Sequence, residues 1–313
     1  MSTTLHQSLA QHLNGVVRLD ALGVIRAQGE DAAKFLHGQL TQDVALMGQH
    51  EARLSAFCSA KGRMLASFVL FKRSDTDIFL VCSADILAPT LKRLAMFVMR
   101  AKAKLSDASQ EFAVYGMAGS RLQAVARDLP GNSLKADIGA ATLVLLSPAG
   151  ITPRGLWIAP AADGAPEGPA LALDLWQWGN VHSGIASITA PIVEAFVPQM
   201  LNYESVGGVN FKKGCYPGQE VVARSQFRGT LKRRGYIVHG DEPMAVGQEI
   251  FSAADAGQPC GTVALAAASP LGGFDAIASM QVAAATSGGL HLGAAGGSAL
   301  SLLPLPYPLL EDI

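Results

Sequence analysis

Residues 213–220, Lys-Gly-Cys-Tyr-Pro-Gly-Gln-Glu, are the most distinctive stretch of the chain. They lie within a longer segment, residues 196–234, FVPQMLNYESVGGVNFKKGCYPGQEVVARSQFRGTLKRR, whose five glycines and two prolines predict a loop with a shaped backbone. Between residues 211 and 234 there are seven basic side chains and a single acidic one, Glu220. A segment so rich in positive charge is expected to meet an anion.

Cys215 lies in the middle of this segment, after Lys212 and Lys213 and before a Tyr-Pro-Gly turn. Neighbouring ammonium groups favour the thiolate, which is the form of cysteine that attacks electrophiles and binds metals. The alternative is a small buried side chain that fills a turn, and the local sequence leaves both open. The other three cysteines lie in apolar, strand-like runs, where a structural role is expected: Cys58, Cys82 and Cys260.

Composition narrows the class of protein. Of 313 residues, 50% are hydrophobic and 16% charged, which excludes an intrinsically disordered chain. A net charge of −1 argues against a protein built mainly to bind nucleic acid. The cysteines form no C-x-x-C pair, so we predict no zinc site, no disulfide framework and a reducing compartment. No targeting signal is evident at the N-terminus, and glycines and prolines interrupt the uncharged stretch 276–310, so a cytoplasmic protein without a membrane span is expected.

The pattern of apolar residues predicts an α+β body followed by a β-rich C-terminal region. Strands are expected at 16–26, 57–58, 64–72 and 77–82, with a turn at 61–63. Helices are expected from residue 30 through Val44 and from Pro89 through Leu105. After about residue 230, short apolar runs separated by Gly, Pro, Asp and Ser predict a small barrel or sandwich.

Three motifs resemble those of the YgfZ family. The first is the 213–220 run, followed by Val222-Ala223-Arg224; the second is Phe196-x-Pro198-Gln199-x-x-Asn202 before it. The third is FLHGQLTQDV, residues 35–44, and together the matches follow the family's order from about residue 20 to 235. Members of this family are folate-binding proteins that support assembly and repair of iron–sulfur clusters. Their fold is similar to that of aminomethyltransferase, the T-protein of the glycine cleavage system.

The resemblance implies a ring of two ferredoxin-like α+β lobes, residues 1–228, and a small C-terminal β-barrel, residues 229–313. Residues of about 50–108 would form the inserted lobe. Tetrahydrofolate, or another reduced folate, is expected in a central cavity, with Cys215 as the working thiol and no metal ligands. The residues expected to hold the folate are those that match the motifs, together with one tryptophan that matches a pocket residue of the family: Gln39, Thr41, Trp176, Asn202, Lys213, Tyr216, Gln219, Glu220 and Arg224.

One departure from the T-protein bears on activity. That enzyme activates its folate with an aspartate on the strand that follows a turn like Lys61-Gly62-Arg63. Here residues 64–70 are MLASFVL, without a carboxylate. Aminomethyl transfer would lack its partner for proton transfer, so the chain is not expected to catalyse that reaction.

The leading hypothesis is a monomeric, folate-binding accessory protein that supports iron–sulfur proteins or their assembly machinery through Cys215. A lone cysteine does not hold a cluster, because clusters need about four thiolates. A folate-dependent transferase of aminomethyl or formyl groups is the enzymatic alternative, which turnover of a one-carbon folate would favour. A factor in tRNA modification is the third; direct nucleic-acid binding is not expected, and RNA binding with a steep salt dependence would favour this reading.

Overall fold

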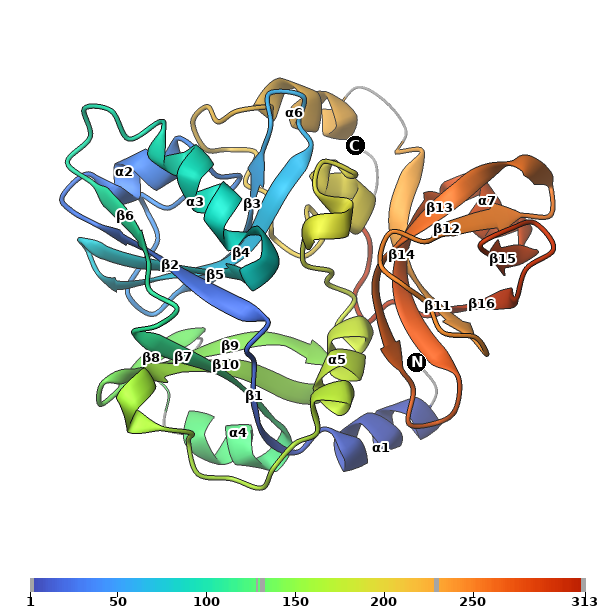
Figure 1. Cartoon of the computed structure of the whole chain (residues 1–313), viewed down its shortest axis with the longest axis horizontal. Helices are drawn as coiled ribbons and strands as arrows, with labels where there is room; N and C mark the ends of the chain where they lie inside the picture. Colours follow the sequence, from blue (N-terminus) through green and yellow to red (C-terminus); the bar gives the residue numbers. More distant parts are fainter. Residues whose placement is uncertain (1–2, 128, 130–132, 228–230, 311–313) are drawn as a thin grey trace.

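The structure is a computed structural model in which residues 3–127, 129, 133–227 and 231–310 are described. These residues form two five-stranded antiparallel sheets and one closed barrel. Figure 1 shows the three as separate lobes, with the chain that follows helix α5 passing between them. The predicted α+β body and C-terminal barrel are therefore confirmed.

The first lobe is a sheet with the strand order β1-β7-β10-β9-β8. Gly155 on β10 lies against Leu122 of helix α4, while Gly116 on β7 lies against Trp176 of helix α5. Gly116 is paired with Leu156, and adjacent strand residues face opposite sides, so the two helices cover opposite faces of the sheet. The elements are α1 (Thr3–His12), β1 (Gly15–Arg18), β7 (Phe112–Ala118), α4 (Gly119–Ala126), β8 (Lys135–Ile138), β9 (Ala141–Ala149), β10 (Thr152–Pro160) and α5 (Leu173–His182).

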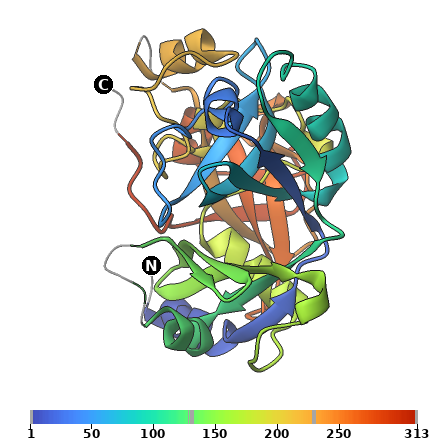
Figure 2. The ribbon, with the colours of Figure 1, turned by 90° about the vertical axis from the view of Figure 1, so that its left-hand side faces the viewer.

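The second lobe is a sheet with the order β3-β4-β5-β2-β6. Its core is aromatic, with Phe57, Phe68, Phe71 and Phe79 almost fully buried. In Figure 1 it lies above the first lobe, and the turned view of Figure 2 keeps the two sheets apart. The elements are β2 (Leu22–Gln28), α2 (Ala32–His37), β3 (Ala52–Cys58), β4 (Met64–Ser74), β5 (Asp77–Ser83), η1 (Ala84–Ile86), α3 (Leu87–Ala95) and β6 (Lys104–Asp107).

The C-terminal barrel closes because β11 pairs with both β14 and β16. Its strands are β11 (Arg233–Gly240), β12 (Glu249–Ser252), β13 (Asp255–Ala268), β14 (Phe274–Gln281), β15 (Leu290–Leu292) and β16 (Ala299–Leu303), with helix α7 (Val282–Ser287). The chain between the first lobe and the barrel holds η2 (Ala161–Asp163), η3 (Ala190–Ile192), η4 (Pro198–Leu201) and α6 (Gln219–Phe227). Every helix among the described residues is too short or too polar to cross a bilayer.

Several of the predicted elements differ from the observed ones. Helix α2 ends at His37 rather than Val44, because Thr41 bonds to Ala56 of β3 and to Gly208, which draws the chain out of the helix. Helix α3 ends at Ala95 rather than Leu105, and Met99 adopts a left-handed φ of 33° that a helix does not allow. The predicted loop 196–234 contains helix α6.

The lobe boundaries also differ from those expected. The sheet of the second lobe takes in β2 (Leu22–Gln28), which is paired with β5 and β6, so this sheet begins well before residue 50. The single strand predicted at 16–26 is two strands, β1 and β2, which belong to different sheets, and the partners of β2 lie about 50 to 80 residues further along the chain. The expected boundary at residues 228 and 229 lies outside the described residues, and the first barrel strand begins at Arg233.

Candidate functional site

The 213–220 run packs against the hairpin turn that joins β3 and β4. Gly218 has a φ of +80°, and a Cβ on it would lie 2.4 Å from the carbonyl oxygen of Ser59. Gly62, at a φ of +71°, faces Val221 in the same contact. Glycine alone accepts both this backbone conformation and this proximity. The two glycines therefore determine how closely the 213–220 run packs on the turn between β3 and β4.

Lys213 fastens the same loop to the end of helix α2. Its ammonium donates hydrogen bonds to the carbonyl oxygens of His37 and Leu40, and it lies 4.8 Å from the centroid of the Tyr216 ring. Burial lowers the pKa of Lys213 to about 8, while the nearby charges of Asp43 and Cys215 act to raise it. These hydrogen bonds thus join residues that are more than 170 positions apart in the sequence.

His37 and Asp43 form a hydrogen-bonded pair at this end of α2. The His37 Nδ1 lies 3.1 Å from Asp43 Oδ1, which also accepts the backbone N–H of Leu46 at 2.9 Å. Burial acts to raise the pKa of Asp43, but the Leu46 bond, His37 and Arg53 together hold it below its usual value. The other ring nitrogen, Nε2, lies 3.5 Å from the position that a Cβ on Gly214 would occupy.

Cys215 is exposed, whereas Cys58, Cys82 and Cys260 are buried. Burial raises the pKa of both Cys58 and Cys82 to about 12, and it also raises the pKa of Cys260. Thiols with such pKa values are almost entirely protonated at neutral pH and are poor nucleophiles. Cys215 is therefore the accessible thiol of the described residues.

Two of the residues expected to hold folate are engaged by the protein's own backbone. Thr41 is fully buried, donates to the Gly208 carbonyl at 2.7 Å and accepts the Ala56 N–H at 2.8 Å. Asn202 is also fully buried, and its side-chain amide forms two hydrogen bonds with the backbone of Gly235 in strand β11. We assign both residues a structural role, because the groups they would offer a ligand are already bonded.

Trp176 lies in the first lobe and not beside the 213–220 run. Its ring packs on Gly116, the Arg154 guanidinium lies 5.1 Å from its centroid, and the residue is 3% exposed. Burial without a carboxylate partner lowers the pKa of Arg154 to about 9. A pterin ring would find no open indole face here, so the expected stacking role does not fit this arrangement.

The remaining predicted residues divide between the core and the surface. Gln39 has a buried Oε1 without a hydrogen-bond partner among the described residues. The Tyr216 hydroxyl is likewise buried and has no hydrogen-bond partner among them. Burial raises the pKa of Tyr216. Gln219 begins helix α6, and Glu220 and Arg224 form an exposed ion pair one helical turn apart. Arg228, one of the basic residues of the segment, lies outside the described residues.

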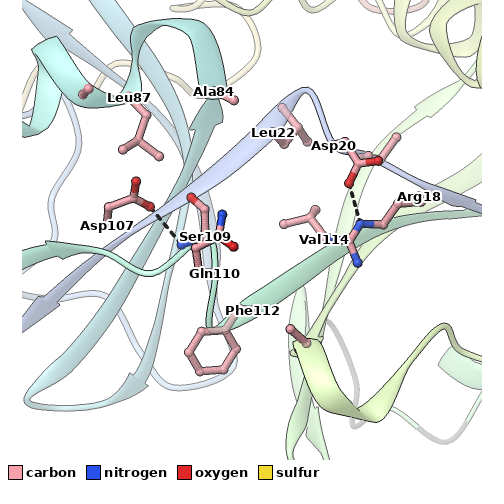
Figure 3. Close-up of a pocket in the computed structure, with 13 residues that line it drawn as sticks. Arg18, Asp20, Leu22, Ala84, Leu87, Asp107, Ser109, Gln110, Phe112 and Val114 are labelled. Carbon is pink, nitrogen blue, oxygen red and sulfur yellow. Dashed lines mark hydrogen bonds and ion pairs between the residues drawn. The ribbon is translucent and has the colours of Figure 1, made fainter.

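Two cavities of about 340 Å³ stand out in the described residues, and none of the predicted site residues lines either. One lies at the seam between the two α+β lobes. Figure 3 shows Asp107, Ser109 and Gln110 on one side of it, the Arg18–Asp20 ion pair on the other, and the Phe112 ring below. The second cavity is apolar and lies over helix α4, beside Pro148 and Ile151. We call the first the seam cavity.

One cluster of titratable groups had no signal in the sequence. Asp275 of β14 is buried and accepts the Trp178 indole N–H at 2.7 Å, with His182 Nε2 and His239 Nδ1 each at 2.8 Å. Burial acts to raise the pKa of Asp275, but these hydrogen bonds outweigh it and hold the pKa below its usual value. Trp178 and His182 lie on α5, so the cluster joins that helix to the barrel. Single Asp and His residues in separate elements have no spacing that would reveal this.

No protein-family model matches the chain. Among curated proteins, the "tRNA-modifying protein YgfZ" of Edwardsiella ictaluri is 32% identical over 316 residues, which cover 95% of this chain and 94% of the relative. That of Colwellia psychrerythraea is 33% identical over 228 residues, covering 70% of this chain and 69% of the relative.

Among solved structures, the glycine cleavage system aminomethyltransferase T from Bartonella henselae superposes with a TM-score of 0.65. The identity is 17%, and the match covers 98% of this chain and 90% of the other. The lobes and barrel thus have the fold of that aminomethyltransferase. Together with the sequence identity to the curated relatives, which extends over nearly the whole length of one of them, this shows that the chain belongs to the YgfZ family.

Proposed function

We propose that this protein is a reduced-folate-binding accessory protein that supports the assembly or repair of iron–sulfur proteins, with Cys215 as its working thiol. The observation that supports it best is the placement of Cys215. Its loop is held by Gly218 against the β3–β4 turn and by Lys213 against α2, yet the cysteine itself is exposed. These buried contacts fix the backbone beneath the exposed thiol. Such a fixed backbone suits a reactive group that must meet another molecule in a defined orientation.

A single thiol suits transfer or repair better than cluster storage. Iron–sulfur clusters are normally held by about four protein thiolates, and the described residues contain no group of three or more His, Cys, Asp or Glu side chains placed to hold a metal ion. Cys215 would act through a mixed disulfide, a sulfenate or a transient metal thiolate. Each of these needs exposure, which Cys215 has and the three buried cysteines lack.

The folate part of the proposal rests on the family and the fold, and the site we propose for it is the seam cavity. Its volume of about 340 Å³ falls in the range of small-molecule pockets. A pterin has N–H donors along one edge, which the carboxylate of Asp107 and the amide of Gln110 would accept. Leu22, Leu87 and Phe112 would offer apolar contact to its ring.

The enzymatic alternative is a folate-dependent one-carbon transferase. Strand β4 begins at Met64, directly after the turn, and its first seven residues have no carboxylate. Proton transfer at the folate nitrogen would lack its group there, which favours binding over turnover. The relatives' name also supports a link to tRNA modification, which we place downstream: a modifying enzyme that needs an iron–sulfur cluster would lose activity without its accessory protein.

The test compares three strains: a deletion strain, one with Cys215→Ser and one with Cys82→Ala, whose cysteine is buried. Activities of iron–sulfur enzymes should fall in the first two and not in the third. Calorimetry with purified protein should show tetrahydrofolate binding in the micromolar range, about −8 kcal/mol. Full cluster-enzyme activity in the Cys215→Ser strain would refute the role of the thiol. Absence of binding to any reduced folate would refute the ligand.

A further inference from the structure

We propose that His37 is the base that ionises Cys215 and that Asp43 positions His37 for this task. The proposal rests on the proposed function, because it assigns the groups that activate the same thiol. Cys215 would then be a nucleophile at neutral pH for soft electrophiles, such as a disulfide or polysulfide sulfur.

The first support is the proximity of the two segments. Lys213 donates to the carbonyl oxygen of His37 itself, and this holds residues 213–215 against the end of α2. Nε2 of His37 lies 3.5 Å from the position of a Cβ on Gly214, the residue directly before Cys215. The imidazole therefore faces the backbone from which the thiol extends.

The second support is the tautomer of the His37 imidazole that the hydrogen bond to Asp43 favours. The pKa of Asp43 lies below the usual value, so it is a carboxylate at neutral pH and accepts a hydrogen bond from the Nδ1–H of His37. In a neutral imidazole that carries its proton on Nδ1, Nε2 has a free lone pair. This is the nitrogen that faces Gly214. The carboxylate is itself fixed by the Leu46 N–H at 2.9 Å.

The third support is the charge around the site. When the thiol proton moves to Nε2, a thiolate and an imidazolium form and the net charge is unchanged. Asp43 would stabilise the imidazolium, and the Lys213 ammonium, whose pKa the charge of Cys215 acts to raise, would stabilise the thiolate. The other titratable or charged groups near the site are Arg53, which donates to the Asp43 backbone, the exposed Lys212, and Tyr216, whose burial raises its pKa.

This arrangement would give a function to His37, the last residue of helix α2, and to Asp43, six residues further along the chain. Their side chains are 22% and 11% exposed, so solvent and a small reagent reach the ring. Asp43 binds Nδ1, and Nε2 faces the loop that bears the accessible thiol.

The test is the rate of Cys215 alkylation by iodoacetamide, followed by mass spectrometry in the native protein. In that reaction the sulfur–carbon bond forms, the carbon–iodine bond breaks, iodide leaves and the thiol proton stays on His37. His37→Gln should slow alkylation at pH 7 by about tenfold, because the thiolate loses its opposite charge. At pH 9.5, above the pKa of about 8.5 of an ordinary cysteine, the variant and the parent should react within about twofold of each other.

Further variants separate activation from a structural effect. Asp43→Asn should also slow the reaction at pH 7, and the double variant should be no slower than His37→Gln, because both act through one route. His50→Gln, at an exposed histidine, is the matched control and should leave the rate unchanged. Circular dichroism and thermal melts check folding. If His37→Gln or Asp43→Asn does not fold, the pH dependence of the parent decides: a rate that follows only the ionisation of an isolated thiol overturns the proposal.

Equal rates for the parent and His37→Gln at pH 7 would also overturn it. This outcome is distinct from failure of the proposed function. Cys215 can be the working thiol without His37, in which case the strain with Cys215→Ser still loses cluster-enzyme activity. Conversely, activation by His37 can hold in the purified protein while that strain keeps full activity.

Discussion

Gly218 lies so close to Gly62 that a Cβ on it would be 2.7 Å from the Gly62 Cα and backbone nitrogen. This contact joins the loop that bears Cys215 to the turn between β3 and β4. It is a contact of backbone against backbone, so side-chain rotation cannot relieve it. The position of the exposed thiol therefore depends on a residue three positions away that has no side chain.

Gly218→Ala should destabilise the protein and loosen the loop, because the methyl group overlaps the Ser59 and Gly62 backbones. Gly207→Ala is the matched control, since Gly207 has a similar φ of +73° but open space around its Cβ position. Both should lose about 1–2 kcal/mol from the left-handed conformation, and Gly218→Ala about 1–3 kcal/mol more from overlap. Chemical denaturation of the two variants measures the difference. Equal losses would mean that the loop is not seated as described.

Lys213→Met should release the loop from helix α2. Methionine keeps the apolar stem but leaves the carbonyl oxygens of His37 and Leu40 without a donor, at a cost of about 1–3 kcal/mol. Hydrogen exchange of residues 213–218 should become faster. Lys212→Met, at the exposed neighbour, should change neither stability nor exchange. Unchanged protection in Lys213→Met would show that the ammonium does not anchor the loop.

Asp275→Asn should destabilise the contact between α5 and the barrel by about 3 kcal/mol. The reason is that one buried carboxylate is hydrogen-bonded to Trp178, His182 and His239. The folded-state pKa of Asp275 lies below that of the unfolded chain. Its contribution is thus complete above the ordinary aspartate pKa of about 3.9 and is lost as the pH falls through the lower, folded value.

The measurement for Asp275 is thermal stability between pH 7 and pH 2, followed by tryptophan fluorescence. The parent should have a higher melting temperature than Asp275→Asn at pH 7, and this difference should become smaller toward pH 2. Asp241→Asn, at an exposed aspartate, is the control and should follow the parent. A constant difference between parent and Asp275→Asn down to pH 2 would contradict the assignment of the lowered pKa.

Folate binding should distinguish the seam cavity from the surroundings of Trp176. Asp107→Asn should weaken tetrahydrofolate binding by about tenfold or more, the cost of a lost charged hydrogen bond of about 1.5–3 kcal/mol. Trp176→Phe should leave the affinity within about twofold, because the indole is covered by Gly116 and Arg154. Calorimetry on both variants is the measurement. If Trp176→Phe weakened binding and Asp107→Asn did not, the folate site would lie beside Trp176 and not in the seam cavity.

The sequence by itself determined the fold class and the kind of residue at the candidate site. Alternating apolar runs and turn residues predicted the strands and the C-terminal barrel, because period-two patterning and glycine turns are local properties. It also singled out Cys215, since a thiol among lysines and glycines differs in its neighbours from Cys58 or Cys82 in apolar strands.

The tertiary structure alone decided what each predicted residue contacts. Thr41 and Asn202 matched the motifs, yet each is bonded to backbone brought in from elsewhere, Gly208 in one case and Gly235 in the other. His37 approaches Gly214 across 177 positions of sequence. Such contacts depend on how sheets, loops and the barrel pack together, and no local period records them. The chain's pattern thus singled out Cys215, whereas packing determined that this cysteine is exposed and that His37 lies near its loop.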